Sequence, residues 1–284
     1  MVLKIAIQKS GRLYDESIQL LKDCGIDIKN GRNQLKAVAD NFPLEVYYLR
    51  DDDIPQYVQD AVADIGIVGQ NVLFEKGKDI EIIKELGFGK CRLSIAVPRG
   101  ENYRDLKFLE GKKIATSYPF LCAQFLKKNR IQAEIHEISG SVEIAPGIGL
   151  ADVICDLVSS GSTLFMNGLK EVETVLESQA VLIKNVSLQS EQLALIEKLV
   201  FRINAVKTAR NNKYILLNAP NEALSTIIEL LPGMKSPTVL PLANEGWSSV
   251  HSVLSEDEFW DKIEALKRAG AQGILVVPIE KMIV

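Results

Sequence analysis

Long apolar runs, histidines and paired cysteines are all scarce in this chain of 284 residues. No run of 18 apolar residues occurs, which argues against a transmembrane helix. The N-terminal MVLKIAIQKSGRL lacks the apolar core of a signal peptide. The cysteines, Cys24, Cys91, Cys122 and Cys155, form no CxxC pair, so we expect buried thiols in the reducing cytoplasm. Two histidines leave little material for a zinc site or a histidine-based triad.

An excess of positive charge is also absent. The chain has 33 Lys and Arg against 37 Asp and Glu, a formal net charge of −4. This balance gives no reason to expect nucleic acid or a membrane surface as a partner, so any basic site must be local. Hydrophobic residues make up 47% of the chain, which is long enough for two or three domains with buried cores.

Short apolar runs alternate with helical patterns from the first residues onward. Lys4–Gln8 and Leu44–Arg50 predict strands, and Asp64–Gly69 is apolar on both faces, as in a covered parallel sheet. This βαβ rhythm predicts an α/β fold that binds ligands beyond the carboxyl ends of its strands. We expect two lobes around a cleft, the first over residues 1–91 with a return segment at 184–211, and the second over residues 92–183.

The last part of the chain, residues 212–284, predicts a separate unit. Its pattern is strand, helix, hairpin pair, helix and strand, and this βαββαβ order is typical of a ferredoxin-like fold. The second helix has a Ser255/Glu258 capping box and ends at Gly270. A unit of this kind is regulatory, mediates assembly or is inert, and its position does not decide among these roles.

Small hydroxylated residues gather in CDLVSSGSTL, residues 155–164. An apolar strand runs through Asp156 into this turn, and a helix is predicted after it. Consecutive amides from Ser159 to Thr163 would form a nest for an anion, and Gly161 would let the backbone approach a phosphate closely. The stretch has no lysine, so it is not a Walker A loop, and the alternative is an ordinary helix N-cap.

Other polar residues follow other predicted strands. Lys9 and Arg12 lie in a strand-to-helix turn, where two cations suit a polyphosphate or are simply solvated. The aspartates of RDDDIP bind Mg²⁺ or cap a helix, and capping is favoured because Asp53 directly precedes Ile54-Pro55. Glu143 of GSVE and the hydroxyls of ATSYP would face the same cleft.

Taken in order, these segments resemble the long form of the ATP phosphoribosyltransferase family. The resemblance rests on QKSGRL, RDDDIP, DIGIVGQNVL, GFGKCRLSIA, GKKIATSYP, GSVEIAP, GLADVICDLVSSGSTL, LLPGMKSPTVLPL and ILVVPIEKM, and it covers essentially the whole chain. It implies two lobes similar to a periplasmic-binding-protein fold, followed by a ferredoxin-like, ACT-type regulatory domain that binds histidine.

The resemblance also implies a reaction, the first step of histidine biosynthesis. N1 of the ATP adenine attacks C1 of phosphoribosyl pyrophosphate (PRPP), and pyrophosphate leaves together with Mg²⁺. Adenine N1 is already a nucleophile, so catalysis is mainly positioning and charge stabilisation. The implied catalytic residues are Lys9, Arg12 and Glu143. PRPP would be bound by Asp156, Ser159, Ser160, Gly161, Ser162 and Thr163, with Asp156 toward the ribose hydroxyls, and ATP by Arg50, Asp64, Ser94 and Ser117.

For the C-terminal unit the resemblance implies feedback inhibition by histidine, with AMP as a second inhibitor. Dimers and hexamers are expected to exchange, and the inhibitor favours the hexamer by binding the two states differently. The histidine pocket, between neighbouring subunits, would include Asn218, Met234, Ser236, Thr238 and Gly273.

Two alternatives come from other classes of protein. The two lobes also suit a non-catalytic protein that binds a small ligand, although the missing signal peptide argues against an exported receptor. A regulator built on the ACT-like unit, with vestigial lobes, is disfavoured by the intact basic and acidic residues of the cleft.

Overall fold

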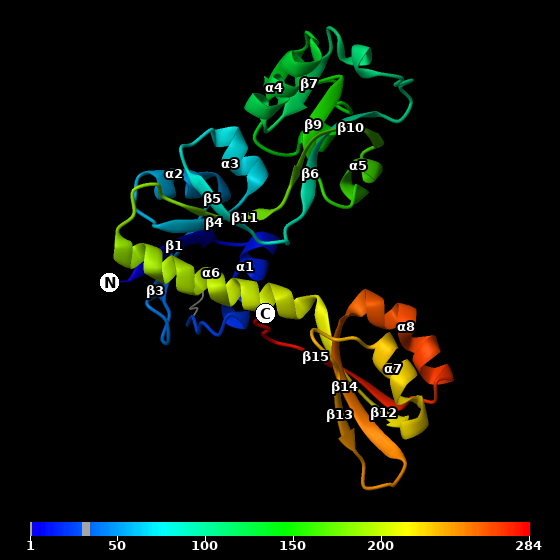
Figure 1. Cartoon of the computed structure of the whole chain (residues 1–284). Coiled ribbons are helices and arrows are strands. Elements are labelled where there is room, and N and C mark those ends of the chain that lie inside the picture. The colour runs from blue at the N-terminus through cyan, green and yellow to red at the C-terminus, as the bar shows by residue number, and fades with distance from the viewer. Residues whose placement is uncertain (1, 30–34) are drawn as a thin grey trace. The chain divides into compact units, whose positions relative to one another are not determined.

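The computed structural model describes residues 2–29 and 35–284 (Figure 1). Their contacts divide the chain into two compact units. The first comprises the residues up to Lys22 together with Ile26–Ile196, and the second comprises Asp23–Gly25 and Glu197–Val284. Within these ranges no helix is long and apolar enough to cross a membrane.

The first unit contains two sheets, and the first sheet has the order β2-β3-β1-β4-β11-β5. Its central strand, β1, pairs in parallel with β3 and β4, while β11 is antiparallel to both β4 and β5. Apolar residues fill both faces of β1, β4 and β11, as predicted for a covered sheet. The strands are β1 (Leu3–Gln8), β2 (Lys36–Val38), β3 (Leu44–Leu49), β4 (Ile65–Gly69), β5 (Glu81–Glu85) and β11 (Ala180–Lys184).

The second sheet repeats this arrangement in the order β10-β6-β9-β7-β8. Here β7 pairs in parallel with β8 and β9, and the antiparallel β6 and β10 complete the sheet. The chain therefore crosses between the lobes twice, from β5 to β6 and from β10 to β11. The strands are β6 (Cys91–Pro98), β7 (Lys113–Thr116), β8 (Glu134–Glu137), β9 (Val153–Val158) and β10 (Leu169–Ser178).

Helices supply the apolar side chains that pack against these sheets. Residues Leu20 and Leu21 of the first helix are fully buried, and Leu121, Cys122 and Leu126 join the core of the second lobe. The structure thus has two similar lobes that two segments of the chain connect. This confirms the predicted periplasmic-binding-protein architecture. The helices of this unit are α1 (Arg12–Asp23), α2 (Ile54–Gln59), α3 (Gln70–Lys76), α4 (Pro119–Asn129), α5 (Ser162–Met166) and the start of α6 (Ser190–Arg210).

The second unit contains a four-stranded sheet of order β13-β14-β12-β15 (Figure 1). Ile227, in the middle of α7, and Leu231, just after its end, share one buried core with Phe259 and Leu266 of α8. The predicted βαββαβ order and the Ser255/Glu258 capping box are both confirmed. The elements are β12 (Asn212–Pro220), α7 (Leu224–Leu230), β13 (Thr238–Pro241), β14 (Trp247–Ser255), α8 (Glu256–Arg268) and β15 (Gln272–Pro278).

The interpretation of Asp53 as a helix cap is wrong. Proline does occupy the first turn of α2, but the Asp53 side chain makes no capping hydrogen bond. Asp51, Asp52 and Asp53 instead form a 3₁₀ turn between β3 and α2. This turn carries Asp53 in helical backbone geometry, in which its side chain does not reach back to the first N–H groups of α2.

Candidate active site

The stretch that follows β9 is a tight loop that leads into a very short helix. Ser159 and Ser160 are exposed, and Gly161 adopts a left-handed conformation with φ of +78°. Only glycine takes up this conformation without strain, which explains its place in the turn. Helix α5 then spans five residues, too few to contribute much of a helix dipole. The anion-binding capacity of the stretch therefore depends on the amides and hydroxyls of the loop.

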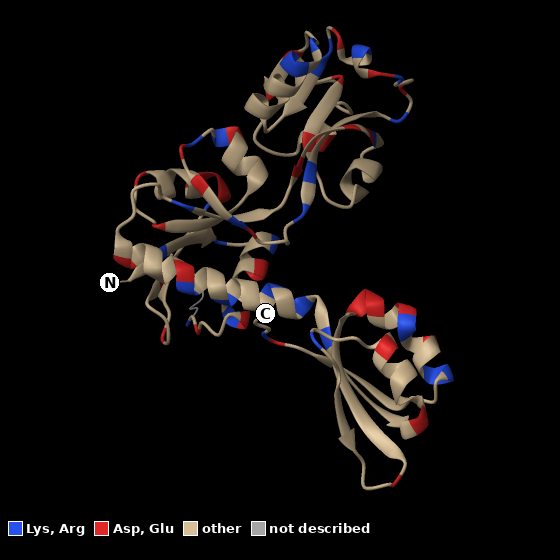
Figure 2. Ribbon diagram, in the orientation of Figure 1, with Lys and Arg blue, Asp and Glu red and all other residues tan. Residues whose placement is uncertain are grey.

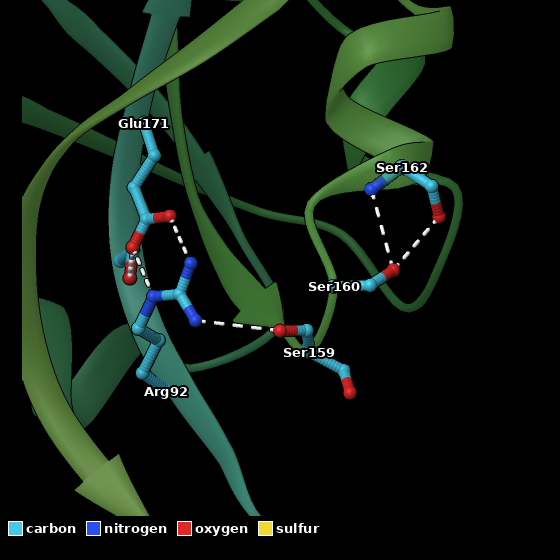
Figure 3. Close-up of polar contacts among 6 residues, drawn as sticks. Arg92, Ser159, Ser160, Ser162 and Glu171 are labelled. Atoms are coloured by element: carbon cyan, nitrogen blue, oxygen red, sulfur yellow. Dashed lines mark hydrogen bonds and ion pairs between the residues drawn. The ribbon is translucent and has the colours of Figure 1, made fainter.

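Several of these polar groups are not used within the protein. In the described part of the chain, the backbone N–H groups of Ser160, Gly161 and Thr163 donate no hydrogen bond. The Ser160 hydroxyl lies 2.9 Å from the Ser162 hydroxyl and weakly accepts the Ser162 N–H at 3.4 Å (Figure 3). Three unbonded amides and two paired hydroxyls thus remain for a ligand that accepts hydrogen bonds.

Two carboxylates accompany the loop. Asp156 lies on β9 and is paired in register with Ser94 of β6, while Glu143 lies in a 3₁₀ turn, Val142–Ile144. Burial, and secondarily the charge of Glu143, raise the pKa of Asp156 to about 6. The charge of Glu143 is therefore felt at Asp156. An acid near the loop is suited to accept hydrogen bonds from hydroxyl groups rather than to bind a phosphate.

The loop reaches a cavity of about 190 Å³ that is lined by residues of both lobes. From the first lobe come Gln8, at the end of β1, Arg12, at the start of α1, and Asp51. From the second lobe come Leu157 and Ser159. Arg12 Nη1 donates a long hydrogen bond of 3.5 Å to Ser159 Oγ, and Arg12 Nε pairs with Glu16 Oε1 at 3.6 Å. A cation from one lobe thus meets the anion loop of the other.

Asp51 contributes a carboxylate with one oxygen that has no partner among the described residues. Its Oδ1 is buried and forms no hydrogen bond within the described residues. Burial, with a smaller effect from Asp52, raises the pKa of Asp51 to about 6. The described ranges contain no cluster of three or more acidic, histidine or cysteine side chains that could hold a metal on its own. One free carboxylate oxygen at a cavity fits Mg²⁺ that is bound mainly by substrate phosphates.

The structure distributes the predicted nucleotide residues over different places. Asp64 precedes β4 at the amino end of the strands, where it accepts hydrogen bonds from the Lys4 N–H at 2.7 Å and from Gln192. It therefore lies at the opposite end of the sheet from Gln8 and Gly69. Ser94 is completely buried and donates to Glu171. The hydroxyl of Ser117 donates to Ile138 O, whereas Lys9 and Arg50 are exposed.

Other residues near the site carry no assignment in the sequence-based prediction. Lys90 and Cys91 line the cavity, and Arg92 donates to the loop carbonyl of Ser159 at 3.3 Å. Asn71, buried at the start of α3, donates to the Tyr118 hydroxyl at 2.9 Å and so connects the lobes. The segment GFGKCRL contains three of these residues. Its two cations, Lys90 and Arg92, lie where the chain passes into the second lobe, and this pattern could have indicated site residues from the sequence.

The predicted effector residues fall into two groups within the C-terminal unit. Met234, Ser236 and Thr238 line a cavity of about 530 Å³ together with Tyr214 and His251. Asn218 and Gly273 lie beside each other elsewhere on the sheet, because a β-carbon on Gly273 would lie 3.3 Å from Asn218 Nδ2. A single chain therefore does not bring all five residues into one pocket.

The fold and the cavity together define a two-lobed α/β protein of the periplasmic-binding-protein type, with an appended ferredoxin-like domain. Residues 50–205 match the family described as ATP phosphoribosyltransferase, and residues 209–281 match the one described as HisG, C-terminal domain. The ATP phosphoribosyltransferase of Cytophaga hutchinsonii is 59% identical over 282 residues, 99% of each chain. That of Bacteroides thetaiotaomicron is 58% identical over 283 residues, 100% of each chain.

A solved structure agrees with these relatives. The ATP phosphoribosyl transferase (HisG:HisZ) complex from Thermotoga maritima superposes with a TM-score of 0.61 at 28% identity. The match covers 72% of this chain and 99% of that chain. The chain belongs to the ATP phosphoribosyltransferase family, and its matched C-terminal domain makes it a long-form member.

Proposed function

We propose that this chain transfers the phosphoribosyl group of PRPP to N1 of ATP, giving phosphoribosyl-ATP and pyrophosphate in the first step of histidine biosynthesis. One observation carries the proposal most directly. The loop Ser159–Thr163 presents unused amides beside a cavity that Arg12 lines from the other lobe. A cradle for one phosphate opposite a cation suits a substrate such as PRPP, which has phosphates at both ends.

In this proposal the loop amides bind the 5-phosphate of PRPP, and the neighbouring acids bind its ribose. With a pKa of about 6, Asp156 is mostly ionised at neutral pH and accepts hydrogen bonds from ribose hydroxyls. Glu143 lies close enough to raise that pKa. Two carboxylates beside the ribose also stabilise the positive charge that develops at C1 when pyrophosphate leaves.

The pyrophosphate is assigned to the basic side of the cavity. Arg12 faces it, with Lys9 in the same exposed turn after β1. Mg²⁺ would accompany the pyrophosphate and neutralise charge on the leaving group, with the free Asp51 oxygen as a protein ligand. We therefore add Asp51 to the proposed site, since its orphaned oxygen needs a cation or a donor.

The ATP site is proposed at the exposed Arg50, which follows β3, and at Ser117, which follows β7. Asp64 and Ser94 are left out of it, because each is buried with its side chain already bonded. Adenine N1 carries its own lone pair, so the protein needs to orient the base rather than activate it. The cysteines of the described residues are all free, which suits a cytoplasmic enzyme.

Histidine and AMP are proposed as inhibitors. The proposed regulatory domain spans residues 212–284. The first catalytic lobe comprises residues 1–91 together with 184–211, and the second comprises residues 92–183.

The strands of the C-terminal sheet carry hardly any charge, whereas α8 carries both signs (Figure 2). Leu240, Leu275 and Val277 are exposed on these strands in the single chain. An uncovered apolar sheet of this kind favours assembly with a second copy, in keeping with exchange between dimers and hexamers. Pairing would also join the two groups of effector residues across subunits.

The direct test is pyrophosphate release after mixing the protein with ATP, PRPP and Mg²⁺. We expect release that requires both substrates, and chelation of Mg²⁺ should stop it. If ATP and PRPP bind but no pyrophosphate appears, the chain is a two-lobed binding protein instead of a transferase. Deleting residues 212–284 should remove inhibition by histidine, and inhibition that persists would locate the effector elsewhere.

A pair of glycine variants tests the role of the loop. Valine at Gly161, where φ is +78°, strains the backbone and turns the amides, so the Kd of PRPP should rise at least tenfold while that of ATP changes little. Gly168→Val is the matched control, because Gly168 has φ of +71° and open space around it but follows α5. Equal losses of PRPP and ATP binding in Gly161→Val would remove the assignment.

A further inference from the structure

A charged cluster next to the phosphate loop has no part in the reaction described above. Arg92 on β6 donates from Nε and Nη2 to the two carboxylate oxygens of Glu171 on β10 (Figure 3). Ser94 donates to the same carboxylate at 2.7 Å. The remaining nitrogen, Arg92 Nη1, donates to the carbonyl of Ser159 at 3.3 Å. The guanidinium thus connects a fixed carboxylate in the sheet to the first residue of the loop.

The strand register explains why Arg92 reaches this point. Arg92 pairs with Val158, the last residue of β9, so its side chain lies where the chain leaves the sheet to form the loop. Arg92 and Ser94 point to the same face of β6 because they are two residues apart on a strand. Glu171 faces them from β10, close to two irregularities in the pairing of β10 with β6. Contacts from β10 and from the end of β9 therefore fix the guanidinium of Arg92 on β6.

The carbonyl that Arg92 holds belongs to the peptide unit whose N–H comes from Ser160. In a trans peptide the C=O and the N–H point in opposite directions. When the Ser159 carbonyl is directed toward β6, the Ser160 N–H must point away from β6, as a free donor. An amide that is already oriented needs no rearrangement when an anion arrives.

The same contacts argue against Arg92 as a direct ligand of the phosphate. Two of its three nitrogens are already used by Glu171, and that carboxylate offsets the charge of the guanidinium. We propose that Arg92 is a positioning residue, which Glu171 and Ser94 hold in place and which fixes the Ser159 peptide so that the loop amides face the PRPP phosphate. This inference rests on the proposed role of the loop as the PRPP site.

The test compares the Kd values of PRPP and ATP among four variants of the full chain. Arg92→Gln should raise the Kd of PRPP about tenfold and leave that of ATP within about twofold. Arg92→Lys should behave like Arg92→Gln, because lysine keeps the charge but cannot span Glu171 and Ser159 together. Glu171→Gln should give a smaller loss. Glu173→Gln is the control, since Glu173 lies on the same strand but accepts from Tyr103 at 2.7 Å, away from the loop.

Backbone ¹⁵N order parameters of the loop in the free protein give a second, independent readout. Most of the loop amides carry no hydrogen bond, so hydrogen exchange would not respond, whereas order parameters report directly on loop motion. We expect lower order parameters in the loop, residues 159–163, for Arg92→Gln and Glu171→Gln, and wild-type values for Glu173→Gln. Wild-type PRPP affinity in Arg92→Gln, or full rescue by Arg92→Lys, would overturn the inference. If Arg92→Gln fails to fold, Glu171→Gln with wild-type affinity for PRPP and wild-type order parameters overturns it instead. Wild-type PRPP affinity in Gly161→Val, by contrast, would remove the role of the loop itself.

Discussion

Replacing Asp156 with asparagine is expected to stabilise the protein. Burial, and secondarily Glu143, raise the pKa of this acid from 3.8 to about 6. The folded protein therefore holds the proton more tightly than the unfolded chain, so its stability falls as the pH rises from about 4 to about 6. A shift of about 2 pKa units corresponds to about 2–3 kcal/mol. Asparagine has no charge to bury, so D156N should gain that amount above about pH 7 and almost nothing near pH 4.

The assay is urea unfolding of D156N and wild type at about pH 4 and about pH 8. Both tryptophans, Trp247 and Trp260, lie in the C-terminal unit, so their fluorescence does not report on the lobe that holds Asp156. Far-UV circular dichroism reports on it at both pH values, and labelling of the buried thiols of Cys122 and Cys155 reports on it at about pH 8, where an exposed thiol is partly ionised.

Asparagine keeps an oxygen for the Leu157 N–H, which the Asp156 side chain accepts, so the comparison isolates the charge. Asp53→Asn is the control, because Asp53 is exposed and caps no helix, and we expect a change below about 0.5 kcal/mol at either pH. A gain in stability that is the same at both pH values, or no gain at pH 8, would refute the reasoning. The Kd of PRPP should rise at least tenfold in D156N as its acceptor for ribose hydroxyls loses its charge.

Two further predictions concern contacts that hold each unit together. The carboxylate of Glu75 on α3 accepts hydrogen bonds from the N–H groups of Phe120 and Leu121, in the first turn of α4, at 2.8 and 2.9 Å. Glu75→Gln should therefore destabilise the first unit by about 1 kcal/mol, which faster labelling of the Cys122 thiol would report. Unchanged labelling would contradict this. In the second unit, a β-carbon on Gly233, where φ is +61°, would lie 2.9 Å from Ser252 Oγ, so Gly233→Ala should cost about 1–3 kcal/mol by tryptophan fluorescence. Gly246→Ala, which has φ of +85° and open space, should cost less, and equal losses would show that the clash is not felt.

Local patterns were enough to predict most of the elements. Alternating and continuous apolar runs marked the strands, and the Ser255/Glu258 pair marked the start of α8. The turn at Gly161 was also visible, because small residues after a buried strand indicate a tight loop. These features depend on backbone preferences and on neighbours a few residues away, which the sequence contains in full.

Placement at the site depended on pairings over long distances in the chain. Asp64 and Gly69 are the first and last residues of one predicted strand. The parallel register with β1 nevertheless puts Asp64 at the amino end of the sheet, away from the cavity. The contact of Arg92 with Ser159 joins residues 67 positions apart. No local pattern determines such a contact, because it depends on which strands become neighbours in the sheet.

The sequence by itself thus determined the two-lobed α/β class, the ferredoxin-like unit and the loop from Ser159 to Thr163, since periodicity and turn chemistry are local properties. Only the tertiary structure decided which polar residues meet. It brought Arg12 and the orphaned carboxylate of Asp51 to the cavity beside the loop, and it used Ser94 to hold Glu171. These placements follow from burial and strand register, which are properties of the whole packed chain.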